Sequence, residues 1–194
     1  MNIFGQEIIK VHCDNKDIYT NEILVSSVKT IFNLPVIKNR KRGDDWDSHY
    51  GEGETTEIVP YLGPAYIPGS EKLTEWVTTQ VNSIYGNSKI TRSWMNRLLE
   101  GSQGRCHNHY NTQLGSPDIV AIFYVDNPEN GSQLVIVDKD YTGILPSDIP
   151  DSNKQYIPTI SGDLIMHGPN IWHAVSEHKN SKPRICFVYQ FNLI

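Results

Sequence analysis

The stretch DIVAIFYVD-NPENGS-QLVIVD, residues 118–138, decides the fold class. Two short apolar runs, rich in β-branched and aromatic residues, flank a polar segment that contains Asn130-Gly131. Such runs are typical of strands, and an Asn-Gly pair favours a tight turn between them. The stretch therefore predicts two consecutive strands.

The same pattern continues on both sides of this stretch. Turn signals at Ser161-Gly162 and Gly168-Pro169-Asn170 separate further short apolar runs. A weakly alternating opening strand is expected over residues 1–11. The other strand-like runs cover residues 90–99, 104–111, 155–160, 163–168, 173–178 and 184–193.

Two segments before residue 89 have helical rather than strand-like spacing. Residues 21–32 carry an apolar stripe, with Asn21 as the expected N-cap and Pro35 as the residue that stops the helix. Residues 70–85 carry a second stripe that Gly86 closes. We therefore expect an α+β, mainly β chain. It would form a double-stranded β-helix (a cupin-like jelly roll) with two N-terminal helices packed on it.

The size of the chain fits one domain. Its 194 residues and 22.1 kDa are enough to bury a core. We expect residues 1–88 to be helical and loop support and residues 89–194 to be the β-helix core. Residues 38–69 are polar and glycine-rich, which is long for a connection inside a compact domain. We expect this segment to be a lid over a substrate.

Charge and cysteine usage exclude several classes of function. The net charge of −5 gives no support for a nucleic-acid partner, and the basic run 38–42 is followed at once by aspartates. Three cysteines without CxxC spacing are typical of reduced thiols in a cytoplasmic protein. Residues 1–10 do not show a basic region followed by an apolar region, as a signal peptide would. The sequence also has no apolar run of membrane-spanning length, so we expect no membrane partner.

The most informative segment for function is Cys106-His107-Asn108-His109-Tyr110-Asn111, which contains two closely spaced potential metal ligands. Alternate side chains of a strand share a face, so His107, His109 and Asn111 would project together. His173 starts a later strand and is the best candidate for a third ligand. Three ligands on one face leave positions open for a co-substrate and dioxygen, as non-haem iron chemistry requires. His167 lies in an apolar run and is expected to be a packed, hydrogen-bonded residue.

In their order and spacing, residues 90–193 resemble the iron(II)- and 2-oxoglutarate-dependent oxygenases, especially the small group found in bacteria and their phages. The resemblance rests on several motifs together. They are ITRSWMNRLLEG (90–101), His-x-His (107–109), IVAIFYV (119–125), GSQLVIVD (131–138), GDLIMHG (162–168), HAV (173–175) and RICFVYQFN (184–192).

The resemblance implies a role for individual residues. His107 and His173 match the first and the distal metal-binding histidines of the family, and His109 stands where the family usually has a carboxylate. Arg184 matches the arginine that pairs with the distal carboxylate of 2-oxoglutarate, and Tyr124 matches a tyrosine that hydrogen-bonds the same group. A guanidinium suits that task because it pairs with a carboxylate in bidentate geometry.

The missing carboxylate leaves three alternatives for the metal site. His109 is itself a ligand, which is the arrangement we favour. Alternatively, His109 and Asn111 form the pair and His107 lies outside the ligand set, or only two histidines bind. Asn96 shares a strand face with Trp94 ahead of the His-x-His motif. It is expected to contact either the co-substrate or the substrate.

The implied activity is that of a dioxygenase, acting as a hydroxylase. It would use Fe(II), 2-oxoglutarate and dioxygen, release succinate and CO2, and hydroxylate a C–H bond of a peptidyl residue such as proline or of a small molecule. One alternative is a cupin-type three-His dioxygenase that needs no 2-oxoglutarate and for which Arg184 is dispensable. The other is a non-catalytic jelly-roll binding module, which would consume no oxygen.

Overall fold

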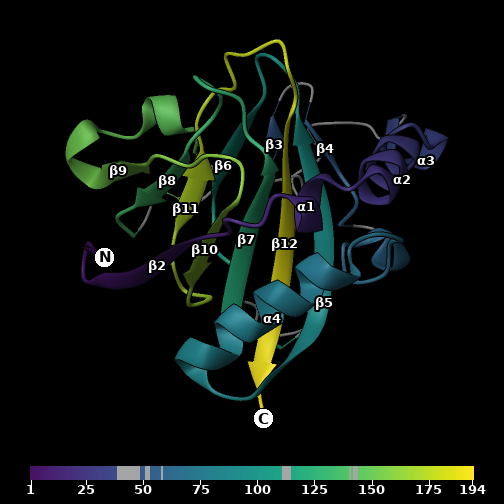
Figure 1. Ribbon diagram of the computed structural model, residues 1–194. Coiled ribbons are helices and arrows are strands. Elements are labelled where there is room, and N and C mark those ends of the chain that lie inside the picture. The colour runs from purple at the N-terminus through teal and green to yellow at the C-terminus, as the bar shows by residue number, and fades with distance from the viewer. Residues whose placement is uncertain (39–48, 51–52, 58, 111–114, 140, 142–143) are drawn as a thin grey trace.

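The computed structural model describes residues 1–38, 49–50, 53–57, 59–110, 115–139, 141 and 144–194 (Figure 1). Four α-helices lie in the first half of the chain: α1 (Asp17–Thr20), α2 (Glu22–Phe32), α3 (Pro35–Lys38) and α4 (Glu71–Tyr85). Three short 3-10 helices are η1 (Pro60–Leu62), η2 (Pro146–Asp148) and η3 (Asp151–Asn153). In this described part of the chain, no helix is long and apolar enough to cross a membrane.

The strands form two antiparallel sheets. The seven-stranded sheet has the order β1-β2-β10-β7-β12-β5-β4 and the five-stranded sheet has the order β3-β6-β11-β8-β9. The strands are β1 (Asn2–Ile3), β2 (Gln6–His12), β3 (His49–Tyr50), β4 (Glu54–Thr55), β5 (Ser88–Leu98), β6 (Gln103–His107), β7 (Ile119–Asp126), β8 (Leu134–Val137), β9 (Lys154–Ile157), β10 (Asp163–His167), β11 (His173–Val175) and β12 (Arg184–Leu193). The predicted mainly β chain with a double-stranded β-helix is confirmed.

Strand alternation divides the core into two layers. On β7, Ile122 and Tyr124 belong to a cluster with Leu134 of β8, between the two sheets. The intervening Phe123 belongs to a second cluster, which also holds Leu73 of α4. Because successive side chains of a strand point to opposite faces, one apolar run fills both layers. The inner layer is the one that can enclose a site.

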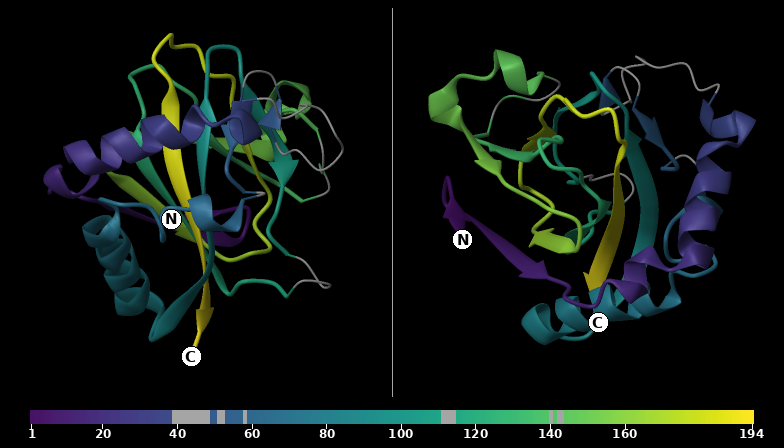
Figure 2. Two further views of the ribbon diagram at one scale, coloured as in Figure 1. Left: turned by 90° about the vertical axis from the view of Figure 1, so that its right-hand side faces the viewer. Right: turned by 45° about the horizontal axis from the view of Figure 1, so that its top comes forward.

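The helices cover the outer face of the seven-stranded sheet (Figures 1 and 2). The Asn21 side chain accepts a hydrogen bond from the backbone N–H of Leu24 at 2.9 Å, so the predicted N-cap of α2 is confirmed. Helix α2 ends at Phe32, before the proline that was expected to stop it. Pro35 instead opens α3, where its fixed φ and missing N–H are tolerated.

The segment predicted to be a lid is only partly described. Its described residues include β4, which pairs with β5 at the edge of the seven-stranded sheet, and β3, which pairs with β6 at the edge of the other. Part of the segment is therefore built into the sheets. Residues 39–48, which include most of the basic run, lie outside the described residues. The lid and the division of the chain at residue 88 stay predictions.

Candidate metal centre

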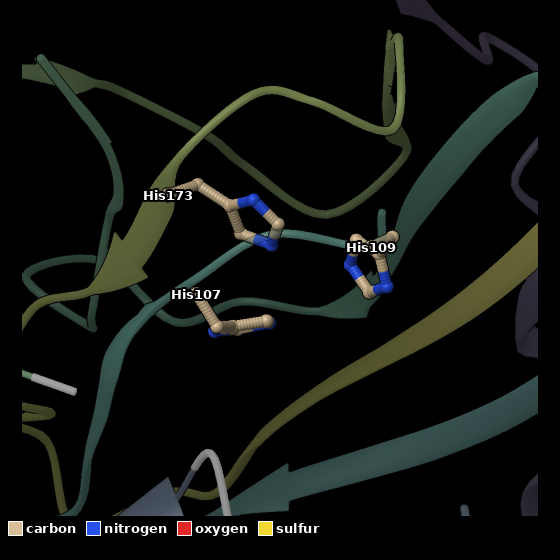
Figure 3. Close-up of side chains that lie close together, drawn as sticks. All are labelled: His107, His109 and His173. Atoms are coloured by element: carbon tan, nitrogen blue, oxygen red, sulfur yellow. The ribbon is translucent and has the colours of Figure 1, made fainter. Parts of the chain in front are cut away.

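Three histidines meet between the two sheets (Figure 3). His107 is the last residue of β6 and His173 is the first residue of β11, and the two lie opposite each other in the antiparallel pair. Their ring centres are 4.4 Å apart, and the ring of His109 lies 5.3 Å from His107 and 5.1 Å from His173. One ligand nitrogen from each ring lies within 4.8 Å of the others. The three histidines predicted from the sequence are thus brought together.

His109 reaches this point by a route that the sequence did not predict. We expected His107, His109 and Asn111 to alternate along one strand, but β6 ends at His107. The backbone N–H of His109 instead donates to the carbonyl of Pro169 at 2.9 Å, in the turn between β10 and β11. This long-range bond brings His109 beside His173. Asn111 lies outside the described residues.

Hydrogen bonds at Nδ1 orient two of the rings. His107 Nδ1 donates to the carbonyl of Arg105 at 2.8 Å, and His173 Nδ1 donates to the carbonyl of Ile171 at 3.0 Å. A carbonyl can only accept, so Nδ1 carries the proton and Nε2 keeps its lone pair. Metal-binding histidines commonly have this arrangement.

The surroundings of His109 and His173 keep these two rings neutral. Desolvation lowers the pKa of His109 well below its ordinary value, and the neighbouring His107 and His167 lower it further. The pKa of His173 is also lowered, first by burial and then by His107 and His167. A neutral imidazole is the form that binds a cation, so His109 and His173 each have a lone pair available near pH 7.

A fourth histidine stands beside this group. His167, the last residue of β10, is fully buried and its ring centre lies 5.0 Å from that of His173. Its Nδ1 donates to the carbonyl of Gly168 at 2.7 Å, as predicted for a packed histidine, but its buried Nε2 has no hydrogen-bond partner among the described residues. Its proximity to the site was missed, because an apolar run shows burial but not what the residue faces.

The cavity in front of the histidines has a volume of about 230 Å³ and is lined by both sheets. Trp94 and Asn96 of β5 and Arg184 and Cys186 of β12 contribute to the lining, so the predicted shared face of Trp94 and Asn96 is confirmed. Arg184 is only 2% exposed, and its guanidinium carbon lies 4.9 Å from the ring centre of Tyr124.

Several polar atoms around this cavity lack partners. Within the described part of the chain, Nε of Arg184 and Oδ1 of Asn96, both in the cavity lining, are buried without a hydrogen-bond partner of good geometry, and so is the hydroxyl of Tyr124, which lies behind the lining beside Arg184. Burial raises the pKa of Tyr124, and Arg184 partly offsets this rise, so the hydroxyl stays protonated and can donate. Unsatisfied buried polar groups are costly, and a bound ligand would satisfy them.

A sequence family described as "Putative 2OG-Fe(II) oxygenase" matches residues 92–190, which is just over half of the chain. The chain belongs to this family. The matched segment contains all three clustered histidines and Arg184. It is therefore an oxygenase of the class whose description names iron(II) and 2-oxoglutarate. No curated protein matches the chain.

Solved structures of similar fold include several oxygenases. HygX from Streptomyces hygroscopicus, with nickel, 2-oxoglutarate and hygromycin B bound, has a TM-score of 0.62 at 11% identity, covering 97% of this chain and 83% of HygX. A Pseudomonas putida prolyl-4-hydroxylase has a TM-score of 0.62 at 10% identity, covering 97% and 94%. The carbocyclase SnoK from nogalamycin biosynthesis has a TM-score of 0.65 at 11% identity, covering 96% and 79%. These likenesses agree with the predicted fold.

The donor set suits a divalent transition metal. Imidazole nitrogens bind iron well, and three ligands on one side leave positions open on the other. The nitrogens face a cavity whose wall carries a buried cation, Arg184. The three clustered histidines differ from the usual two-histidine, one-carboxylate set in offering no negatively charged donor.

Proposed function

We propose that this oxygenase binds iron(II) through His107, His109 and His173, and binds 2-oxoglutarate between that metal and Arg184. The observation that carries the proposal is the shared cavity. The three imidazoles and the buried guanidinium line the same enclosed space of about 230 Å³. A small dianion that also chelates the metal would contact both groups at once.

The buried cation of the cavity wall supports a dianionic co-substrate, and the acidic side chain that also lines the cavity, Glu57, pairs with Arg92 at 3.4 Å. A buried guanidinium without a carboxylate partner is unfavourable, and no described carboxylate forms an ion pair with Arg184. A distal carboxylate of the ligand would supply the missing partner, with a further hydrogen bond from the Tyr124 hydroxyl. We assign Asn96, which lines the cavity, either to the co-substrate, to which its amide N–H would donate, or to a substrate that donates to its unsatisfied Oδ1.

Iron with 2-oxoglutarate and dioxygen supplies the oxidant for attack on a C–H bond, with release of succinate and CO2. The chain's own part is to hold ligands and to limit water. His173 is 2% exposed and Trp94 is 3% exposed, so this side of the centre is shielded by protein. Arg184 and Tyr124 fix the orientation of the co-substrate.

We propose a peptidyl residue such as proline, or a small molecule, as the substrate. Similar folds include the prolyl-4-hydroxylase from Pseudomonas putida, whose name gives a prolyl substrate, and HygX, which was solved with the small molecule hygromycin B bound. A cytoplasmic location is proposed because all three cysteines are buried free thiols.

The test is succinate release from 2-oxoglutarate with iron(II) under air, for the wild-type protein and for Arg184→Ala. The proposal predicts succinate from the wild type and a loss of at least about tenfold in the variant. Adding a proline-containing peptide or an aminoglycoside should raise the rate if either is a substrate. Turnover without 2-oxoglutarate would instead favour the three-His dioxygenase, which the all-imidazole ligand set makes the second candidate.

A further inference from the structure

His109 differs from the other two histidines of the centre in what holds its ring. His107 and His173 each donate Nδ1–H to a backbone carbonyl, an acceptor that no substitution of a side chain removes. The Nδ1 of His109 lies 3.2 Å from the side-chain amide nitrogen, Nε2, of Gln190. The orientation of this amide decides which nitrogen of His109 carries the ring proton.

The side-chain amide of Gln190 can form a hydrogen bond with Nδ1 in two ways, as a donor or as an acceptor. Its nitrogen donates to an unprotonated Nδ1, and the ring proton then sits on Nε2, where it blocks a metal. Turned by 180°, the amide places its oxygen at the same point and accepts from Nδ1–H, which leaves the Nε2 lone pair free. Only the second arrangement makes His109 equivalent to His107 and His173.

We propose that Gln190 is a positioning residue that accepts the Nδ1–H of His109 and thereby holds Nε2 toward the metal, at the place where the family usually has a carboxylate. This inference rests on the metal centre proposed above. It extends that proposal by assigning to Gln190 the task of orienting His109, the histidine that stands in place of the family's acidic ligand.

The strand that carries Gln190 is well placed for this role. Gln190 lies on β12 with Arg92 of β5 opposite it on one side and Val120 of β7 on the other. Two neighbouring strands therefore fix its backbone, and the side chain is only 9% exposed. The inner face of β12 also carries Arg184, so one strand supports both the co-substrate and a metal ligand.

Changing the charge and the hydrogen-bonding capacity of residue 190 tests the proposal, because it predicts the direction in which metal affinity changes. A leucine at position 190 cannot accept a hydrogen bond, so His109 loses its orientation. A glutamate accepts more strongly than an amide and adds a negative charge next to the imidazole, which raises the basicity of the ligand. The two variants should therefore change metal affinity in opposite directions.

The experiment titrates metal-stripped protein with Co2+ and follows the visible absorption of the bound ion. Gln190→Leu should weaken Co2+ binding by about 10- to 100-fold, the usual loss when the group behind a metal-bound histidine is removed. Gln190→Glu should bind at least as tightly as the wild type. Gln155→Glu is the matched control, since Gln155 is exposed on β9 at the edge of the other sheet, and it should leave the affinity unchanged.

A Gln190→Leu protein that folds and binds Co2+ within twofold of the wild type would overturn the proposal. So would a Gln190→Glu protein that binds as weakly as the leucine variant. If Gln190→Leu fails to fold, imidazole nitrogen NMR of the zinc-loaded wild type decides: His109 bound through Nε2 supports the role, and His109 bound through Nδ1 refutes it. A wild type that binds no metal, or binds it equally well without His109, refutes the proposed function instead.

Discussion

Replacing Arg184 by methionine is expected to abolish tight binding of 2-oxoglutarate while leaving the ligand-free protein folded. Methionine keeps the unbranched stem in its buried position but removes the charge. The ligand-free protein loses the contact with Tyr124, worth about 0.5–2 kcal/mol. The substitution also removes the destabilising effect of burying a cation without a carboxylate partner. Because these effects oppose each other, its melting temperature should change by only a few degrees.

The effect on ligand binding should be much larger. Removing one member of a buried, hydrogen-bonded charge pair costs about 2–5 kcal/mol, or about 30-fold to several thousand-fold in Kd. At a 2-oxoglutarate concentration of about 100 times Kd, the wild type should gain ~2.7 kcal/mol of stability, which raises Tm by roughly 5–11 °C. At that concentration the variant should gain at most about 0.9 kcal/mol, for a 30-fold loss of affinity, and almost nothing for a loss of several thousand-fold.

The assay is thermal unfolding with and without 2-oxoglutarate, in the presence of a divalent metal that does not turn over. Lys72→Met, on the exposed side of α4, removes a positive charge far from the cavity and should keep the full shift. If Arg184→Met binds 2-oxoglutarate within threefold of the wild type, the assignment of Arg184 to the co-substrate is incorrect.

The remaining predictions concern the ligand set, the buried histidines and the helix cap. His109→Ala should lower iron bound after loading by about tenfold or more, as measured by metal analysis; unchanged iron content would remove His109 from the ligand set. Burial lowers the pKa of His167 from 6.5 to about 4, so the unfolded chain binds more protons in that window and stability falls as pH falls. In urea unfolding of the metal-free protein, the free energy of unfolding should therefore fall between pH 7.5 and pH 4.5. The fall should be smaller by roughly 2–3 kcal/mol in His167→Asn; an identical pH dependence in both proteins would contradict this. Asn21→Ala removes the cap of α2 and a hydrogen bond to the Gly69 carbonyl, and should lower the free energy of unfolding by about 1–2 kcal/mol, as measured by thermal unfolding. Asn21→Ser, which can still cap the helix, should lose less. Equal losses in the two variants would argue against the cap.

The sequence determined the features that depend on local pattern. Apolar runs and turn residues predicted the two consecutive strands over residues 118–138 and the later strands, because alternation and turn chemistry are properties of neighbouring residues. That these two strands belong to different sheets could not be read from them. The spacing of the two helical stripes predicted α2 and α4 for the same reason. His107 and His173 were singled out because each lies in a predicted strand, whereas Arg184 was assigned through the resemblance to the oxygenase family; all three lie at the end of a strand.

Only the tertiary structure decided how the site is completed. His109 lies beyond the end of β6, and a hydrogen bond to Pro169, sixty residues further along the chain, brings it to the other rings. Gln190 and His167 are on different strands, each opposite Val120 of β7, and the register of three strands makes them neighbours of the centre. Alternation tells which face a side chain takes, but only pairing between distant segments determines what lies across from it.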